Sequence, residues 1–125
     1  MKFTDLKFTE NSIGGVGATH TFNNGIRISV QASEINYCTP RKNLKSKDDY
    51  VSFEVAIFDS NGDFITSKYI SDAVDDVLGH QDRDAIDNLM VKIQEDSELI
   101  KALTYAVENE FITMSQAFEI IRNIK

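Results

Sequence analysis

The sequence predicts an α+β fold, with an antiparallel sheet of about five strands built from hairpins, followed by three or four α-helices. Two observations indicate this order. Over residues 1–70, apolar and polar residues alternate in short segments that are separated by asparagine-glycine turns. Over residues 71–125, apolar residues recur at spacings of three and four, which is the helical period. Strands followed by helices in a chain of 125 residues are typical of a single α+β domain.

The turn chemistry predicts the register of one hairpin, which joins residues 16–22 to residues 26–31. A three-residue loop, Asn23-Asn24-Gly25, places glycine at the last, left-handed position. That loop keeps apolar residues on one face in three pairs: Phe22 with Ile26, His20 with Ile28, and Ala18 with Val30. His20 is therefore expected to pack on the apolar face, and no nearby nucleophile or carboxylate suggests a catalytic role.

The same logic predicts a second hairpin, in which residues 50–58 pair with residues 64–70 around Ser60-Asn61-Gly62. This loop would place Phe58 opposite Phe64. The flanking D-x-N-x-D pattern resembles the start of a calcium loop but lacks the glycine and glutamate that such a loop requires, so we interpret it as a turn. Lys2 to Thr9 is predicted as an edge strand.

Helix capping signals divide the second half of the chain. Ser71 is expected to start a short acidic helix that ends at Gly79. Asp82 is expected to cap a helix to Gln94, with one apolar face at helical spacing: Ile86, Leu89, Met90 and Ile93.

Two further helices are predicted between Ser97 and Lys125, and they would form a helical hairpin. Ser97 is expected to cap the first, and a Thr113–Gln116 capping box the second. Because the sheet is small, some of the apolar residues of these helices are expected to stay exposed: Leu99, Leu103, Val107, Phe111, Phe118, Ile121 and Ile124. We expect this hairpin to mediate homodimerisation or partner docking, with burial on the chain's own sheet as the alternative.

Composition limits the classes of partner. The net charge of −7 and the estimated pI of 4.7 argue against general binding to nucleic acid or to a membrane surface. The single cysteine, Cys38, excludes an internal disulfide and fits a reducing compartment. The N-terminal residues lack the apolar core of a signal peptide, and an intracellular location is expected.

The acidic residues that follow the predicted sheet offer one candidate surface. Three of them share a helical spacing with His80 nearby, which is a weak pattern for metal binding or acid–base catalysis. We instead expect a solvated helix start or an acidic face for a basic partner, and we predict no catalytic residues, metal or cofactor. The residues expected to bind a partner are Asp72, Asp75, Asp76, Asp82 and Asp84.

A basic loop offers the alternative. The segment TPRKNLKSKDD is a long polar connection, and a solvated loop is the simpler interpretation. As a functional site it would bind an anion, with phosphates contacted by four side chains: Arg41, Lys42, Lys45 and Lys47.

Four motifs appear in a characteristic order: a glycine pair at Gly14, F-x-N-G followed by I-S-V, F-E-V-A, and D-D-V-L-G. In this order the chain resembles a loose group of small bacteriophage proteins, over about Gly14 to Ile93. The basic loop and the last two helices, Ser97 to Lys125, are extra to that pattern. The resemblance implies a phage or prophage origin and action in the host bacterial cytoplasm. It carries no functional residue with it.

The functional hypothesis that follows is a non-enzymatic anti-defence protein. It would bind and inhibit a host bacterial defence protein, such as a CRISPR effector or another immune nuclease, by presenting carboxylates where phosphates would lie. One alternative is a binder that sequesters a nucleotide immune signal through the basic loop. A second alternative is a metal-dependent hydrolase that uses the aspartates.

Overall fold

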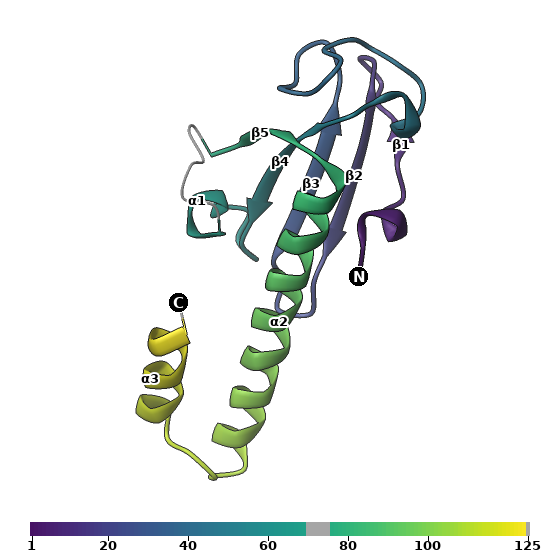
Figure 1. The fold of residues 1–125 in the computed structure, drawn as a ribbon. Coiled ribbons are helices and arrows are strands. Elements are labelled where there is room, and N and C mark those ends of the chain that lie inside the picture. Colours follow the sequence, from purple (N-terminus) through teal and green to yellow (C-terminus); the bar gives the residue numbers. More distant parts are fainter. Residues whose placement is uncertain (70–75, 125) are drawn as a thin grey trace.

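The computed structural model describes residues 1–69 and 76–124, and of residues 97, 98, 100, 101 and 124 only the backbone. The strands form one antiparallel sheet whose spatial order follows the chain: β1 (Thr9–Glu10), β2 (Val16–Thr21), β3 (Arg27–Ala32), β4 (Phe53–Phe58) and β5 (Leu78–Gln81). The helices are η1 (Phe3–Asp5), η2 (Lys47–Asp49), α1 (Thr66–Tyr69), α2 (Arg83–Glu108) and α3 (Met114–Ile124). The predicted α+β class with a five-stranded antiparallel sheet is confirmed (Figure 1).

The first hairpin has the predicted register. Ala18 pairs with Val30 and His20 with Ile28, and the Phe22 amide donates to the Ile26 carbonyl at 2.7 Å. Gly25 has φ of 85°, the left-handed conformation that the three-residue loop requires. His20 lies on the core face, half-buried, with its ring edge-on to Phe22.

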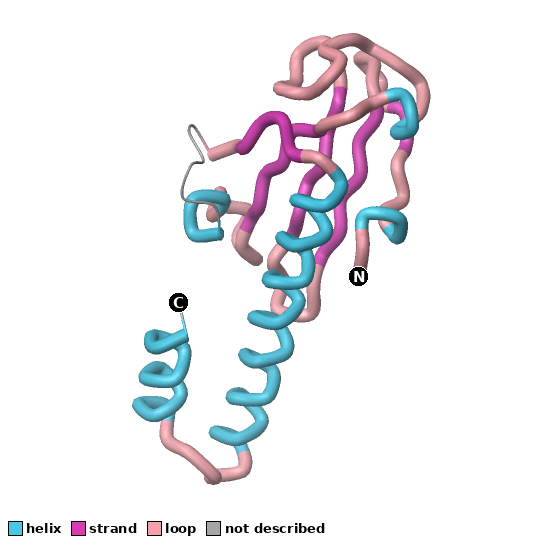
Figure 2. The backbone as a smooth tube through the Cα atoms, viewed as in Figure 1, coloured by secondary structure: helices cyan, strands magenta, loops and turns pink. Residues whose placement is uncertain are grey.

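One face of the sheet carries the core, and the first half of α2 covers it (Figure 2). Strand residues at alternate positions are fully buried: Ile28, Val30, Phe53, Val55 and Ile57. The predicted apolar face of α2 packs against them through Ile86, Leu89, Met90 and Ile93. Asp82 caps this helix as expected, because its carboxylate accepts from the Ala85 amide at 2.8 Å.

The predicted N-terminal strand is wrong for most of its length. Residues Phe3–Asp5 form the 3-10 helix η1, and only Thr9–Glu10 pairs with the sheet. Phe3 and Leu6 are both buried, and one tight turn places residues three apart on the same side. The Asp87 carboxylate accepts from the Phe3 amide and ties this turn to α2.

The second hairpin begins as predicted and then departs from a strand. Phe58 bridges Phe64, and the Ile65 amide donates to the Ile57 carbonyl at 2.7 Å. Residues Thr66–Tyr69 then form α1 instead of continuing a strand. The buried Thr66 hydroxyl accepts from the Ile57 amide at 2.9 Å, so a side chain replaces the strand partner at this position.

Strand β5 takes the place beside β4 that residues 64–70 were expected to fill. Gly79 therefore lies in a strand, and its prediction as a helix C-cap is wrong. A side chain at Gly79 would meet Tyr37, because a Cβ built there lies 2.5 Å from the Tyr37 Cβ. The predicted helix start at Ser71 lies outside the described residues.

Helix α2 runs unbroken from Arg83 to Glu108, so the predicted boundary at Ser97 is wrong. This segment contains neither glycine nor proline, and a serine alone does not end a helix. The second half of α2 projects beyond the sheet, and α3 folds back beside it (Figure 1). Among the helices that the structure describes, none combines the length and the apolarity that crossing a membrane requires.

We expect a shortened chain, residues 1–98, to remain folded, because the described part of the sheet core has no member beyond Ile93. The loss in free energy of unfolding should be about 1–2 kcal/mol, whereas Ile93→Ala in the same shortened chain should cost about 2–5 kcal/mol. Circular dichroism with denaturant titration measures both. An unfolded 1–98 chain would show that the projecting hairpin belongs to the core.

Candidate functional site

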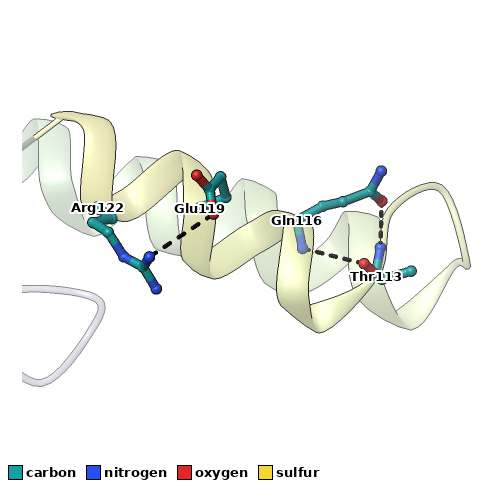
Figure 3. Close-up of polar contacts among 4 residues, drawn as sticks. All are labelled: Thr113, Gln116, Glu119 and Arg122. Carbon is teal, nitrogen blue, oxygen red and sulfur yellow. Dashed lines mark hydrogen bonds and ion pairs between the residues drawn. The ribbon is translucent and has the colours of Figure 1, made fainter.

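The second half of α2 and α3 form a helical hairpin, which we define as residues 97–124. Its turn is closed by the Phe111 amide, which donates to the Ala106 carbonyl at 2.8 Å. The predicted capping box is present: the Thr113 amide donates to the Gln116 side chain at 2.8 Å, and the Gln116 amide to the Thr113 hydroxyl at 3.1 Å (Figure 3). The start of α3 is therefore set by its own sequence.

More large apolar side chains are exposed than buried in the described part of the helical hairpin. Ala117 and Leu103 are buried, and Leu99, Val107 and Ile121 are half-buried. Of the eleven large hydrophobic residues exposed in the described chain, five belong to this hairpin: Tyr105, Phe111, Met114, Phe118 and Ile120. Tyr105 and Phe111 contact each other with ring centroids 6.4 Å apart, and exposed apolar side chains gathered on one hairpin favour an interaction surface.

The polar side of α3 adds little to its stability. Glu119 and Arg122 lie one turn apart, and their charged groups approach to 4.0 Å with both side chains mostly exposed (Figure 3). Such surface pairs contribute about 0–1 kcal/mol. The position of α3 consequently depends on its apolar side, which α2 covers only in part.

The predicted acidic surface is described only in part, because Asp72 and Asp75 lie outside the described residues. Asp76 is exposed, with φ of 68°, and its carbonyl accepts from the Thr66 hydroxyl at 2.7 Å. Asp82 is engaged as the N-cap of α2, and Asp84 is exposed in the first turn. Within the described chain, Asp82 and Asp84 are therefore brought together at the start of α2.

No cluster of three or more histidine, cysteine, aspartate or glutamate side chains suited to a metal ion occurs in residues 1–69 and 76–124. His80, which the sequence placed near the aspartates, lies in β5 with its Nδ1 3.3 Å from the Thr39 hydroxyl. The described residues thus offer no support for the hydrolase hypothesis, which remains a prediction.

The structure divides the four residues of the basic loop into separate environments. Arg41 lies over the Tyr37 ring at 4.9 Å and donates to the Glu34 carbonyl. The Lys42 side chain is exposed. Lys45 and Lys47 line a cavity beside β1. The four side chains therefore do not form one anion site, and only the last two share a concave surface.

A polar arrangement around Glu54 was missed by the sequence reasoning. Its carboxylate accepts from the Asn36 side chain at 3.1 Å and from the Tyr37 amide at 2.8 Å, so it anchors the loop that follows β3. Glu54 is 17 residues from Tyr37 in sequence. No local spacing predicts this contact, because strand pairing brings the two together.

Burial also perturbs the pKa of Tyr69, a group that the sequence did not single out. Burial raises the pKa of Tyr69 well above its usual range, and the charge of Asp96 and a hydrogen bond with it raise the pKa further. Asp96 is buried on α2, and Lys92 lies over the Tyr69 ring. This contact ties α1 to α2 just before the helical hairpin begins.

Comparison with protein-family models, with curated proteins and with solved structures found no match to this chain.

We expect Cys38 to resist thiol reagents in the folded protein. Its side chain is 2% exposed, and burial raises the pKa of the thiol, so less thiolate is present at pH 8. Reaction with a chromogenic disulfide reagent at pH 8 should be at least about 100-fold slower in the native protein than in denaturant. A Cys38→Ala, Ser60→Cys variant, with its cysteine in an exposed turn, should react fast in both states. Equal native rates for the two proteins would contradict the buried position of Cys38.

Proposed function

We propose that this protein is a non-enzymatic binding protein that acts as a homodimer, with the helical hairpin as the dimer interface. The observation that carries the proposal is the exposed apolar surface of the hairpin, above all Phe111, Met114 and Phe118, which are 73%, 56% and 57% exposed. Aromatic residues and methionine are enriched at the centres of protein interfaces. Their removal from water is the driving force for association.

The charge distribution favours a second copy of the chain as the occupant of this surface. The helical hairpin and the terminal Lys125 together, residues 97–125, contain four acidic and three basic residues, a net charge of −1. The other 96 residues carry −6. Two copies of an acidic protein repel each other, and they can approach with least repulsion through the end of the molecule that is nearly neutral.

The shape of the helical hairpin suits a symmetric dimer. Two antiparallel hairpins packed on their apolar sides form a four-helix bundle. Such a bundle buries the apolar sides of both hairpins. A two-fold axis places the same patch on both subunits, so one set of apolar side chains serves both partners. The hairpin also projects beyond the sheet (Figure 1).

The dimer leaves the acidic end of α2 free for a second partner. Asp82 and Asp84 lie at the opposite end of α2 from the hairpin turn. The resemblance to phage proteins motivates the identity of that partner: a host bacterial defence protein, such as an immune nuclease, whose basic groove accepts carboxylates in place of phosphates.

We expect size-exclusion chromatography with light scattering to give twice the mass of one 14.1 kDa chain at micromolar concentrations. Phe118→Glu should convert the dimer to a monomer, because a charge would be buried at the interface. Ile35→Glu is the matched control, since Ile35 is 62% exposed on a loop outside the hairpin, and this variant should stay dimeric. A wild-type protein that is monomeric at every concentration would overturn self-association.

For the second partner we expect Asp84→Lys to weaken recovery of a host protein from bacterial lysate by at least about tenfold, since charge reversal at an interface costs about 2 kcal/mol or more. Glu119→Lys, which reverses an exposed charge on α3, serves as the control. Recovery of one partner in equal amounts by both variants would remove the acidic surface from the proposal.

A further inference from the structure

A cavity beside β1 is a concave site that the sequence alone did not predict. Its volume is about 250 Å³, and it lies between the edge strand and the loop that contains η2. Its lining combines cationic, apolar and polar residues: Phe8, Thr9, Glu10, Val16, Lys45, Ser46 and Lys47. Pockets for small molecules measure about 300–1,000 Å³, so this cavity lies just below that range and suits a ligand at the small end of that class.

Two lysines on this cavity lack acidic partners. Neither Lys45 nor Lys47 lies within salt-bridge distance of a carboxylate in the part of the chain that the structure describes. The Lys47 ammonium lies 5.8 Å from the Phe8 ring centroid and 5.9 Å from that of Phe3. With Glu10 as the only acidic residue of the lining, the cavity carries a net charge of +1 on a protein with net charge −7, and this favours an anionic ligand.

The loop that carries these lysines is held in place by hydrogen bonds that do not involve their ammonium groups. Arg83 donates to the carbonyls of Lys47 and Tyr50, each at 2.9 Å. The buried Tyr50 hydroxyl donates to the Lys42 carbonyl at 2.6 Å and accepts from the Leu44 amide at 2.8 Å. The backbone is thus fixed on both sides of Lys45, and a ligand would not have to order this loop when it binds.

The other residues that line the cavity indicate which kind of anionic ligand would fit it. Phe8 is half-buried and Val16 is buried, so this side of the cavity is an apolar surface with one aromatic ring, on which a planar group can stack. Glu10 and Thr9 supply oxygen acceptors for hydroxyl or amino groups. The carboxylate of Glu10 also opposes a highly charged ligand, and this favours one phosphate over three.

We propose that this cavity binds a nucleoside monophosphate. Lys45 and Lys47 contact the phosphate, the ring of Phe8 stacks on the base, and Glu10 accepts hydrogen bonds from the sugar hydroxyls. This site is separate from the helical hairpin, so its failure leaves the dimer proposal unaffected.

Isothermal titration calorimetry of the full chain tests the proposal with AMP, GMP, CMP and UMP. Adenosine, inorganic phosphate and ATP serve as comparison ligands. We expect at least one monophosphate to bind with Kd below about 1 mM and its nucleoside to bind at least about tenfold more weakly, because a charge-assisted contact is lost. Affinity should also fall as salt is raised from 50 to 500 mM.

Three variants assign the contacts. Lys45→Met and Lys47→Met keep the aliphatic stem and should each weaken the monophosphate by about tenfold or more. Lys42→Met removes an exposed charge from the same loop but outside the cavity lining, and it should bind as the wild type does. Lys45 is exposed, so its variant keeps the test valid if circular dichroism shows that Lys47→Met has lost structure.

The outcomes are distinct. Binding that is weakened by Lys45→Met and unchanged by Lys42→Met supports the site. Absence of heat with all four monophosphates overturns it, as does equal weakening by Lys42→Met. Inorganic phosphate that binds as tightly as the monophosphates also overturns the proposal, since the cavity would then recognise only an anion.

Discussion

The packing of the first half of α2 on one face of the sheet is the constraint on which the rest of the molecule depends. Ile86, Met90 and Ile93 are fully buried there against strands β2 to β4. Burial of each such side chain contributes about 1.5–3 kcal/mol to the free energy of unfolding. The contact between α2 and the sheet therefore sets where α2 lies and in which direction it leaves the sheet. A strand of six residues spans only about 20 Å. A helix of 26 residues spans about 39 Å, and its second half must extend beyond the sheet.

The apolar side chains on the projecting part of α2 cannot be buried against the sheet and must be buried by another element. Helix α3 supplies some of this burial, through Ala117 and the half-buried Ile121. The apolar side of α3 is wider than one neighbouring helix can cover, and Phe118 stays exposed beside it. A second hairpin would complete the burial, and the mismatch in length between helix and sheet is thus the physical origin of the proposed interface.

At the other end of the molecule, aromatic rings and cations organise the cavity. Phe3, Phe8 and Phe53 contact one another with centroids 5.1–5.7 Å apart. Arg83 lies over the rings of Phe3 and Phe53 and also holds the loop backbone. The guanidinium joins α2, the core and the loop in one contact, because it can stack and donate hydrogen bonds at once. The same packing that buries the core thereby fixes the lysines around the cavity.

The sequence by itself determined the features that local interactions control. These are the α+β order, the register of the hairpin at Gly25, the N-cap at Asp82, the capping box at Thr113 and the apolar face of α2, because each is specified within a few residues. Only the tertiary structure decided whether residues 66–69 form a strand or a helix. The Thr66 hydroxyl accepts the hydrogen bond of the Ile57 amide in β4, which a neighbouring strand would otherwise accept. Tertiary contacts also decided that Gly79 lies in a strand and that Lys45 and Lys47, but not Arg41 and Lys42, share a cavity. Contacts between residues far apart in the chain control these features, and no local pattern in the sequence encodes them.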